Sequence, residues 1–205
     1  MSGTGKSFWA QKLAAAGFRA ISIDDRIEEK LAPELALGGF RGIGGVAAWM
    51  GWPDQPGYQE RARKYLAGEI ESMEETLNEI EKTPGGGIVL DTTGSVVYTG
   101  DAICRRLRQL TLVVYLESCP EEQKTLIARY LSDPKPVLWG DQFAPRPGET
   151  TEETVRRCYP LLIADRMRLY PQYAHRAVAM KRLRDPGLDA RGFLELVDVQ
   201  ARPVG

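Results

Sequence analysis

The chain has 205 residues, of which 27 are Lys or Arg and 28 are Asp or Glu, giving a formal net charge of -1. This length suits one domain with a buried core, and the mixed charges show no basic stripe of the kind that binds nucleic acid. The three widely spaced cysteines, Cys104, Cys119 and Cys158, favour reduced thiols in a cytoplasmic protein over a disulfide framework or a zinc site. The sequence contains no signal peptide and no transmembrane run, and its single histidine argues against histidine-dependent catalysis.

The beginning of the chain contains the second half of a phosphate-binding loop. The segment Gly3-Thr4-Gly5-Lys6-Ser7 matches the end of the pattern G-x-x-x-x-G-K-[ST], and an amphipathic helix is expected up to Gly17. Glycines let backbone N–H groups surround an anion, Lys6 can reach the outer phosphates, and the Ser7 hydroxyl can bind Mg²⁺. The alternative is a glycine-capped helix start without a ligand. The pattern predicts ATP and Mg²⁺ as ligands, with nucleotide contacts from Ser2, Gly3, Thr4, Gly5, Lys6 and Ser7.

Two carboxylates follow short apolar runs that we interpret as buried strands. Asp24 follows Ala20–Ile23, and Asp91 follows Ile88–Leu90. Ligands of parallel α/β sheets bind at the carboxyl ends of strands, so we expect Asp24 to act on a substrate and Asp91 to hold the Mg²⁺ water shell. Alternatively, each residue caps a helix or a turn. Just beyond Asp91, the turn Thr93-Gly94-Ser95 would bring its backbone close to a substrate.

The rest of the chain predicts helices alternating with two more strands, which favours a parallel sheet covered on both faces. The expected strands are Leu110–Leu116 and Ala177–Met180. The expected helices are Ile27–Leu31 onward, Val46–Gly51, Pro53 to about Lys82, Asp101–Gln109, Pro120 to about Leu131, one capped by Thr151, and one from Asp189 to about Val199.

Three cations outside the phosphate loop are candidates for binding. A proline-rich segment at about 132–150 has the length of a lid or binding loop. Lys135 lies in it and Arg129 just before it, and either could reach a transferring phosphoryl group or could simply be a solvated charge. Arg166 stands among aromatic residues of the following helix. We interpret it as a fork for a carboxylate, with a surface position as the alternative.

These motifs resemble the shikimate kinase family, within the nucleoside-monophosphate-kinase group of phosphate-loop proteins. The resemblance covers most of the chain. It rests on Gly3-Thr4-Gly5-Lys6-Ser7, Asp24 with Ile27-Glu28, Val89 to Ser95, Lys135-Pro136-Val137-Leu138, and Arg166-Met167-Arg168-Leu169-Tyr170 with Ala174.

The resemblance implies a fold and an activity. The fold is a P-loop NTPase three-layer αβα sandwich, a single domain over 1–205 with parallel strands in the order 2-3-1-4-5, a substrate-binding helical part at about 32–83 and the lid. The activity is transfer of the γ-phosphoryl group of ATP to a hydroxyl of a small molecule, with Lys6, Asp24 and Lys135 as catalytic residues. Arg166 would bind a substrate carboxylate, and Gln59, Thr93, Gly94 and Ser95 would also contact the substrate.

Several positions depart from the family pattern. Ser22 replaces the first acid of a D-x-D motif, so Asp91 is the expected metal acid, while Lys135 and Gln59 stand where the family has arginines. We therefore expect shikimate to be a poor acceptor. Two other functions stay open: a nucleotide-binding regulatory protein without turnover, and a nucleoside or nucleic-acid 5′-kinase, which would need a basic groove.

In the strand order that the resemblance implies, the first and central strand is missing from this chain. The first glycine of the loop would also fall one residue before Met1. We expect the natural protein to begin upstream, with a short Val/Ile/Leu-rich run that ends in Gly.

Overall fold

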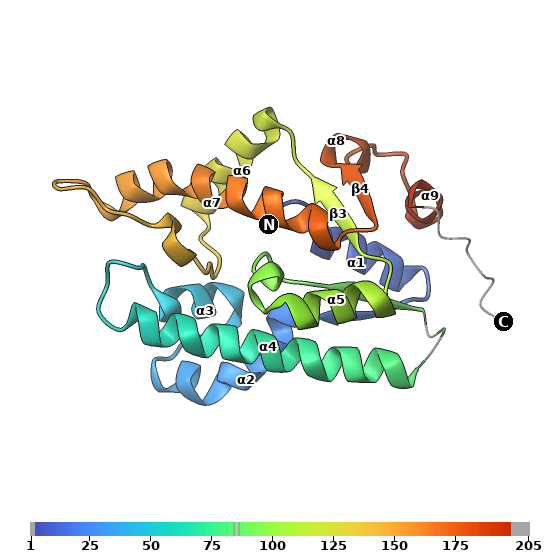
Figure 1. Ribbon diagram of the computed structural model, residues 1–205, viewed down its shortest axis with the longest axis horizontal. Coiled ribbons are helices and arrows are strands. Elements are labelled where there is room, and N and C mark those ends of the chain that lie inside the picture. Colours follow the sequence, from blue (N-terminus) through green and yellow to red (C-terminus); the bar gives the residue numbers. More distant parts are fainter. Residues whose placement is uncertain (1–2, 84, 86, 198–205) are drawn as a thin grey trace.

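The structure is a computed structural model that describes residues 3–83, 85 and 87–197 (Figure 1). Helices dominate it and surround two small sheets. The helices are α1 Lys6–Ala15, α2 Ile23–Leu37, α3 Gly42–Met50, α4 Tyr58–Lys82, α5 Asp101–Leu110, α6 Pro120–Ser132, α7 Thr151–Tyr173, α8 Met180–Leu183 and α9 Ala190–Leu196. The 3₁₀ turns are η1 Val96–Tyr98 and η2 Gly140–Gln142. The strands are β1 Arg19–Ser22, β2 Ile88–Asp91, β3 Val114–Glu117 and β4 Arg176–Ala179.

The four strands form two separate parallel pairs. In the first pair β1 lies beside β2 with Ser22 opposite Asp91, and in the second β3 lies beside β4 with Val114 opposite Arg176. Within the described residues no strand joins the two sheets. The prediction of a P-loop NTPase three-layer αβα sandwich, with strands in the order 2-3-1-4-5, is therefore wrong. The chain folds as a mostly helical protein with two two-stranded parallel sheets.

Local sequence features explain why β1 and β3 are so short. The apolar run at 110–116 predicts one strand, but Leu110 ends α5 and β3 begins only at Val114. An apolar run of this length fits the end of a helix as well as it fits a strand. At β1, the Ser22 hydroxyl accepts a hydrogen bond from the Asp25 N–H and caps α2, so the strand stops there and Asp24 lies in a helix.

The predicted helices are close to the observed ones, with shifted ends. The long helix α4 begins at Tyr58 and not at Pro53, because Gly57 adopts a left-handed conformation (φ 80°) immediately before it. The last helix, α9, is capped by Asp189 as expected. Its predicted end at Val199 lies outside the described residues.

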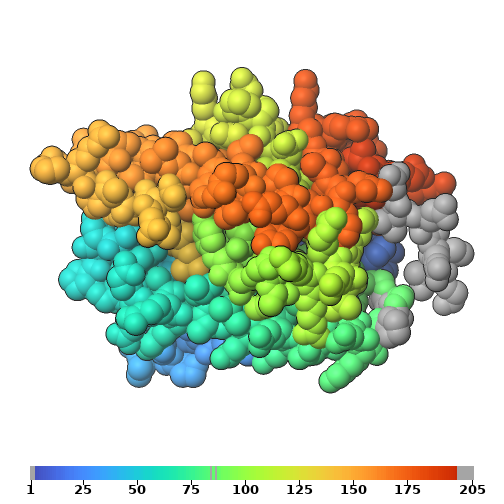
Figure 2. Space-filling model, viewed as in Figure 1, coloured from blue at the N-terminus to red at the C-terminus, as the bar shows by residue number. Residues whose placement is uncertain are grey.

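One hydrophobic cluster runs from α1 to α9 and includes buried residues of all the larger helices. On α4, Tyr65, Met73 and Leu77 are buried at helical spacing, and α4 packs against α2, α3 and α5. Figure 1 shows α4 along one side of the molecule with α2 and α3, and α7 along the other side. In the space-filling view the segment that leads into α7 projects at one end (Figure 2). No helix of the described part is long and apolar enough to cross a membrane.

Candidate functional site

The phosphate-loop residues form a tight turn at the start of α1. Gly3 and Gly5 have φ angles of 78° and 96°, and Gly5 is the N-cap of α1. Only glycine adopts such angles without strain, so the sequence pattern is explained by the backbone. The first turn of α1 contains no acidic residue, and no side chain caps it. The positive end of the helix dipole is therefore left for an anion. Ser2 lies outside the described residues.

Ser7 and Asp91, the two predicted metal ligands, are in contact. The Ser7 hydroxyl donates a hydrogen bond to Asp91 Oδ2 over 2.5 Å, although 84 positions separate the two residues. Asp91 is buried, and its Oδ1 has no hydrogen-bond partner among the described residues. Mg²⁺ prefers oxygen ligands and commonly takes one or two from protein and the others from phosphates and water. These oxygens therefore fit Mg²⁺, although no group of three His, Cys, Asp or Glu side chains within 3–83, 85 and 87–197 could hold a metal.

Asp24 completes this cluster from the first turn of α2. Burial raises the pKa of its carboxyl group, Lys6 lowers that pKa and Asp91 raises it further. Asp24, Lys6 and Asp91 are therefore close enough to interact electrostatically. Tyr65 also donates a hydrogen bond to Asp24 Oδ1 over 3.4 Å. A half-buried carboxylate with a raised pKa is suited to accept a proton from a hydroxyl group.

The turn Thr93-Gly94-Ser95 is held by a buried carboxylate on α4. The hydroxyls of Thr93 and Ser95 both donate hydrogen bonds to Glu69, the Ser95 bond over 2.7 Å. Burial raises the pKa of Glu69 to about 7, even though these hydroxyls and Arg166 lower it. On the other side, the Tyr170 hydroxyl donates to the Gly94 carbonyl oxygen over 2.6 Å. The turn is therefore fixed from two helices.

Sequence reasoning missed Glu69. A signal was available, because Glu69 is four residues from both Tyr65 and Met73 and so lies on the apolar stripe of α4. A carboxylate on the buried face of a helix needs a hydrogen-bonding partner, which indicates a structural or functional role.

Arg166 is a buried cation without an anionic partner among the described residues. Its side chain on α7 is 5% exposed, and Nη2 donates a hydrogen bond to the Leu138 carbonyl oxygen over 2.9 Å. Its guanidinium carbon lies 5.2 Å from the centre of the Tyr98 ring. Nε has no hydrogen-bond partner, and none of the carboxylates in the described part of the chain forms an ion pair with Arg166. Glu69 lies within electrostatic reach of Arg166 but forms no ion pair with it, so the open Nε–H could donate to the carboxylate of a bound anion.

The other predicted site residues are Gln59, Lys135 and Arg129, and none of them is shown in contact with the Ser7–Asp91 pair. Gln59 is exposed, whereas its neighbour Tyr58 is buried and donates a hydrogen bond to the Val137 carbonyl oxygen. Lys135 forms an ion pair with Asp133 over 2.7 Å. Arg129 lines a cavity of about 400 Å³ together with the phosphate loop. The other lining residues are Phe8, Trp9, Lys12, Met180, Leu183, Arg184, Asp185 and Pro186.

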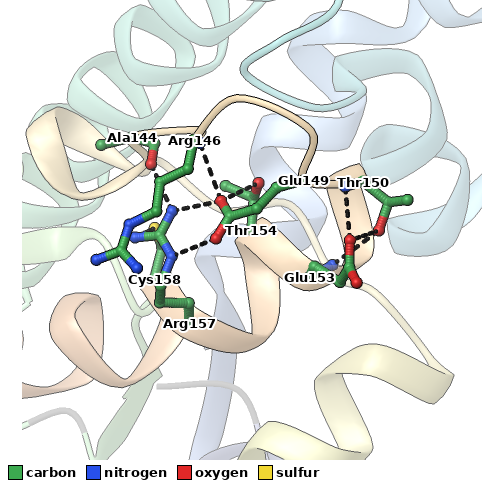
Figure 3. A network of polar contacts seen from close by, with 8 residues as sticks. All are labelled: Ala144, Arg146, Glu149, Thr150, Glu153, Thr154, Arg157 and Cys158. Atoms are coloured by element: carbon green, nitrogen blue, oxygen red, sulfur yellow. Dashed lines mark hydrogen bonds and ion pairs between the residues drawn. The ribbon is translucent and has the colours of Figure 1, made fainter.

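The end of the 132–150 segment is fastened to α7 by an ion pair (Figure 3). Arg157 donates to both carboxylate oxygens of Glu149, over 2.7 and 2.6 Å, and also to the Ala144 carbonyl oxygen. Thr154 and the Arg146 N–H donate to Glu149 as well. Hydrogen bonding with Arg157 lowers the pKa of Glu149 to about 2. Arg157 and Glu149 therefore neutralise each other within the protein.

Comparison with known proteins adds no assignment: no protein-family model matches the sequence, and no curated protein matches it. The functional interpretation therefore depends on the side chains and their geometry. The structure brings Lys6, Ser7, Asp24 and Asp91 together at the start of α1. It places Glu69 and Arg166 within electrostatic reach of each other behind the Thr93–Ser95 turn.

Proposed function

We propose that the protein is an ATP-dependent phosphotransferase that moves the γ-phosphoryl group of ATP to a hydroxyl of a small molecule. The observation that carries the proposal is the contact of Ser7 with Asp91 at the N-terminus of α1, beside Lys6 and Asp24. A glycine turn, a lysine, a hydroxyl and two carboxylates are the groups that phosphoryl transfer requires. The cavity of about 400 Å³ beside Gly3, Thr4 and Gly5 has the size of a small-molecule pocket and supports a nucleotide there.

Each residue would have a defined task in the transfer. The N–H groups around Gly5 and the Lys6 ammonium would bind the β- and γ-phosphates, and Mg²⁺, held by Ser7 and Asp91, would neutralise part of their charge. The acceptor oxygen would form a bond to the γ-phosphorus while the bond between that phosphorus and the β–γ bridging oxygen breaks, releasing ADP. Asp24 would accept the hydroxyl proton, for which its raised pKa is suited.

The acceptor would lie between Arg166 and the Thr93–Ser95 turn. Arg166 provides a buried guanidinium with Nε unsatisfied among the described residues, so an acceptor with a carboxylate or another anionic group is favoured. The Gly94 backbone and the two hydroxyls of the turn would contact its neutral part. The proposal includes the resemblance to the shikimate kinase family. Because Gln59 is exposed and Lys135 is paired with Asp133, we expect shikimate itself to be a poor acceptor.

The test is ADP release from ATP and Mg²⁺ with a panel of polyols, nucleosides and hydroxy acids that includes shikimate. Lys6→Ala should lower acceptor-dependent turnover by roughly 100-fold or more, since it removes a charge that acts in the transition state. Lys64→Ala is the matched control, because Lys64 lies on α4 and pairs only with Glu34 and Glu60 in the described structure. Turnover of Lys6→Ala within about tenfold of wild type, a loss of only ~1.4 kcal/mol, would contradict the proposal.

The metal ligands can be tested in the same assay. Asp91→Asn should raise the Mg²⁺ concentration needed for half-maximal activity. Ser22→Ala should not, because the Ser22 hydroxyl caps α2. The Ser22 variant should instead lose about 1 kcal/mol of stability. Equal Mg²⁺ requirements of the two variants would remove Asp91 from the metal site.

A second candidate is a nucleotide-binding regulatory protein without turnover. It is favoured by the two weak positions, exposed Gln59 and paired Lys135. It predicts that ATP binds, that binding depends on Lys6, and that no acceptor of the panel gives ADP.

A further inference from the structure

Tyr65 is a polar side chain on the buried face of α4. It is 1% exposed, so its hydroxyl group is removed from solvent. A buried hydroxyl needs a hydrogen-bond partner, whereas phenylalanine would fill nearly the same volume without one. The acceptor of this hydroxyl is Asp24 Oδ1, 41 positions earlier in the chain, on the neighbouring helix α2. Tyr65 therefore connects the core of the protein to the carboxylate that accepts the proton in the proposed transfer.

A second polar group lies one turn after Tyr65 on the same helix. Glu69 is fully buried and accepts hydrogen bonds from the Thr93 and Ser95 hydroxyls of the turn that would contact the acceptor. Residues four positions apart lie on one face of a helix. A single rigid helix therefore presents a hydroxyl to the proton-accepting carboxylate and a carboxylate to the acceptor turn.

The surroundings of Tyr65 make its hydroxyl a hydrogen-bond donor. Burial raises the pKa of Tyr65 well above its ordinary value, and the charges of Asp24 and Glu69 raise it further. Arg166 and hydrogen bonding with Ser95 lower this pKa without reversing the shift. The hydroxyl therefore keeps its proton at neutral pH and can donate it in a hydrogen bond to a carboxylate oxygen.

We propose that Tyr65 is a positioning residue of the phosphoryl transfer, a role that rests on the function proposed above. Its hydroxyl holds Oδ1 of Asp24, so that Oδ2 is the oxygen that takes the proton of the acceptor hydroxyl while the acceptor oxygen bonds to the γ-phosphorus and ADP leaves. Glu69 fixes the acceptor turn relative to the same helix. The two oxygens of the Tyr65–Asp24 bond are 3.4 Å apart, and catalytic hydrogen bonds of such length commonly tighten once the substrate is bound.

Tyr58 provides a matched comparison on the same helix. It lies seven positions, or about two helical turns, before Tyr65 and is 3% exposed. Its hydroxyl donates to the Val137 carbonyl oxygen, a backbone group outside the proposed reaction. Replacement of either tyrosine by phenylalanine removes one buried hydroxyl and keeps the ring. A purely structural role predicts the same consequences at both positions.

The test compares Tyr65→Phe with Tyr58→Phe in the ADP-release assay, with the best acceptor of the panel. Tyr65→Phe should lower kcat by about tenfold, a part of the effect that a well-placed general base commonly has, and should keep the KM for ATP within about twofold of wild type. Tyr58→Phe should keep the kcat of wild type. Both variants should unfold at a similar urea concentration, so a lower kcat of Tyr65→Phe alone would not be a result of lost stability.

A double variant tests whether Tyr65 acts through Asp24. In the Asp24→Asn background the proton acceptor is already lost, so Tyr65→Phe should lower kcat no further. Labelled ATP keeps slow turnover measurable. A wild-type kcat in Tyr65→Phe, or an equal loss in both backgrounds, would overturn the role of Tyr65 and leave the proposed function standing. Absence of acceptor-dependent turnover in wild type would overturn both.

Discussion

Two arginines on the same helix have opposite surroundings. Arg157 near the start of α7 forms a two-pronged ion pair with Glu149 and donates a further hydrogen bond to a carbonyl oxygen. Arg166, nine positions later, is more deeply buried and has one carbonyl partner and an unsatisfied Nε. The charge and the hydrogen bonds of Arg157 are satisfied within the protein by Glu149 and Ala144. Arg166 forms no ion pair with a described carboxylate, and its Nε–H has no hydrogen-bond acceptor among the described residues.

The same contrast holds for two glutamates. Glu149 accepts several hydrogen bonds, and its pKa is lowered to about 2. Glu69 is fully buried, and burial raises its pKa to about 7. The difference teaches that an arginine forks and neutralises Glu149, whereas Glu69 is held by two neutral hydroxyls, so that burial favours a bound proton on its carboxyl group.

Replacing Arg157 or Arg166 by Met should give the largest difference in stability. Arg157→Met breaks the pair with Glu149, so we expect a lower melting temperature and faster exchange in 143–150. Arg166→Met removes a buried charge that forms no ion pair, but it also removes the hydrogen bond to the Leu138 carbonyl oxygen, so the free energy of unfolding should change by less than about 1 kcal/mol. Urea unfolding of the two variants measures this. A loss of more than about 1 kcal/mol for Arg166→Met would show that the apo protein already satisfies Arg166.

The next effect is the pH dependence caused by Glu69. The ordinary pKa of a glutamate side chain is 4.5, whereas the pKa of Glu69 in the folded protein is about 7, so the folded state holds the extra proton between these values. Stability should therefore fall as pH rises from about 4.5 to 7, by about 3 kcal/mol from this group. Asp24, Arg166, Tyr65, Thr93 and Ser95 surround it.

The check is the difference between wild type and Glu69→Gln in urea unfolding across this pH range. The matched control is Glu71→Gln, since Glu71 lies on the exposed face of the same helix. Glu71→Gln should keep the slope of wild type. A Glu69→Gln slope that equals the wild-type slope would place the titration elsewhere.

The smallest effect concerns Glu149. Its folded pKa is below the ordinary value, so its contribution is present above about pH 4.5 and disappears as pH falls towards 2. Carbon-detected NMR titration should give midpoints near 2 for Glu149 and near 7 for Glu69. Glu149→Gln should accelerate exchange only within 143–150. Midpoints that coincide would remove the contrast between the two regions.

The sequence predicted local elements better than their assembly. The glycine loop, the cap at Asp189 and most helix positions follow from short-range patterns, and these appear in the structure. The sheet arrangement does not, because the pairing of four-residue strands depends on distant contacts that no local pattern encodes.

The candidate site could be predicted only where its residues belong to short sequence patterns. Lys6 and Ser7 belong to one motif, and Asp91 follows an apolar run, so their types and positions indicated a shared role. Glu69 could have been singled out from its place on the apolar stripe of α4, but its partners, Thr93 and Ser95, are more than twenty positions away and no local pattern indicates them. Gln59 was named from a resemblance, and its exposure on α4 shows that alignment by type does not fix the direction of a side chain.

The contacts that hold the segment before α7, residues 132–150, indicate where it can tolerate an insertion. Arg166 holds it at the Leu138 carbonyl oxygen, and Arg157 holds it at Ala144 and Glu149. Trp139 between these points is buried, but residues 145–148 are exposed. A peptide inserted at 145–148 should therefore leave the fold intact and disrupt only the turn between Arg146 and Glu149. The same insertion at 138–139 would disrupt the core around Trp139 and the hydrogen bond from Arg166 to the Leu138 carbonyl oxygen.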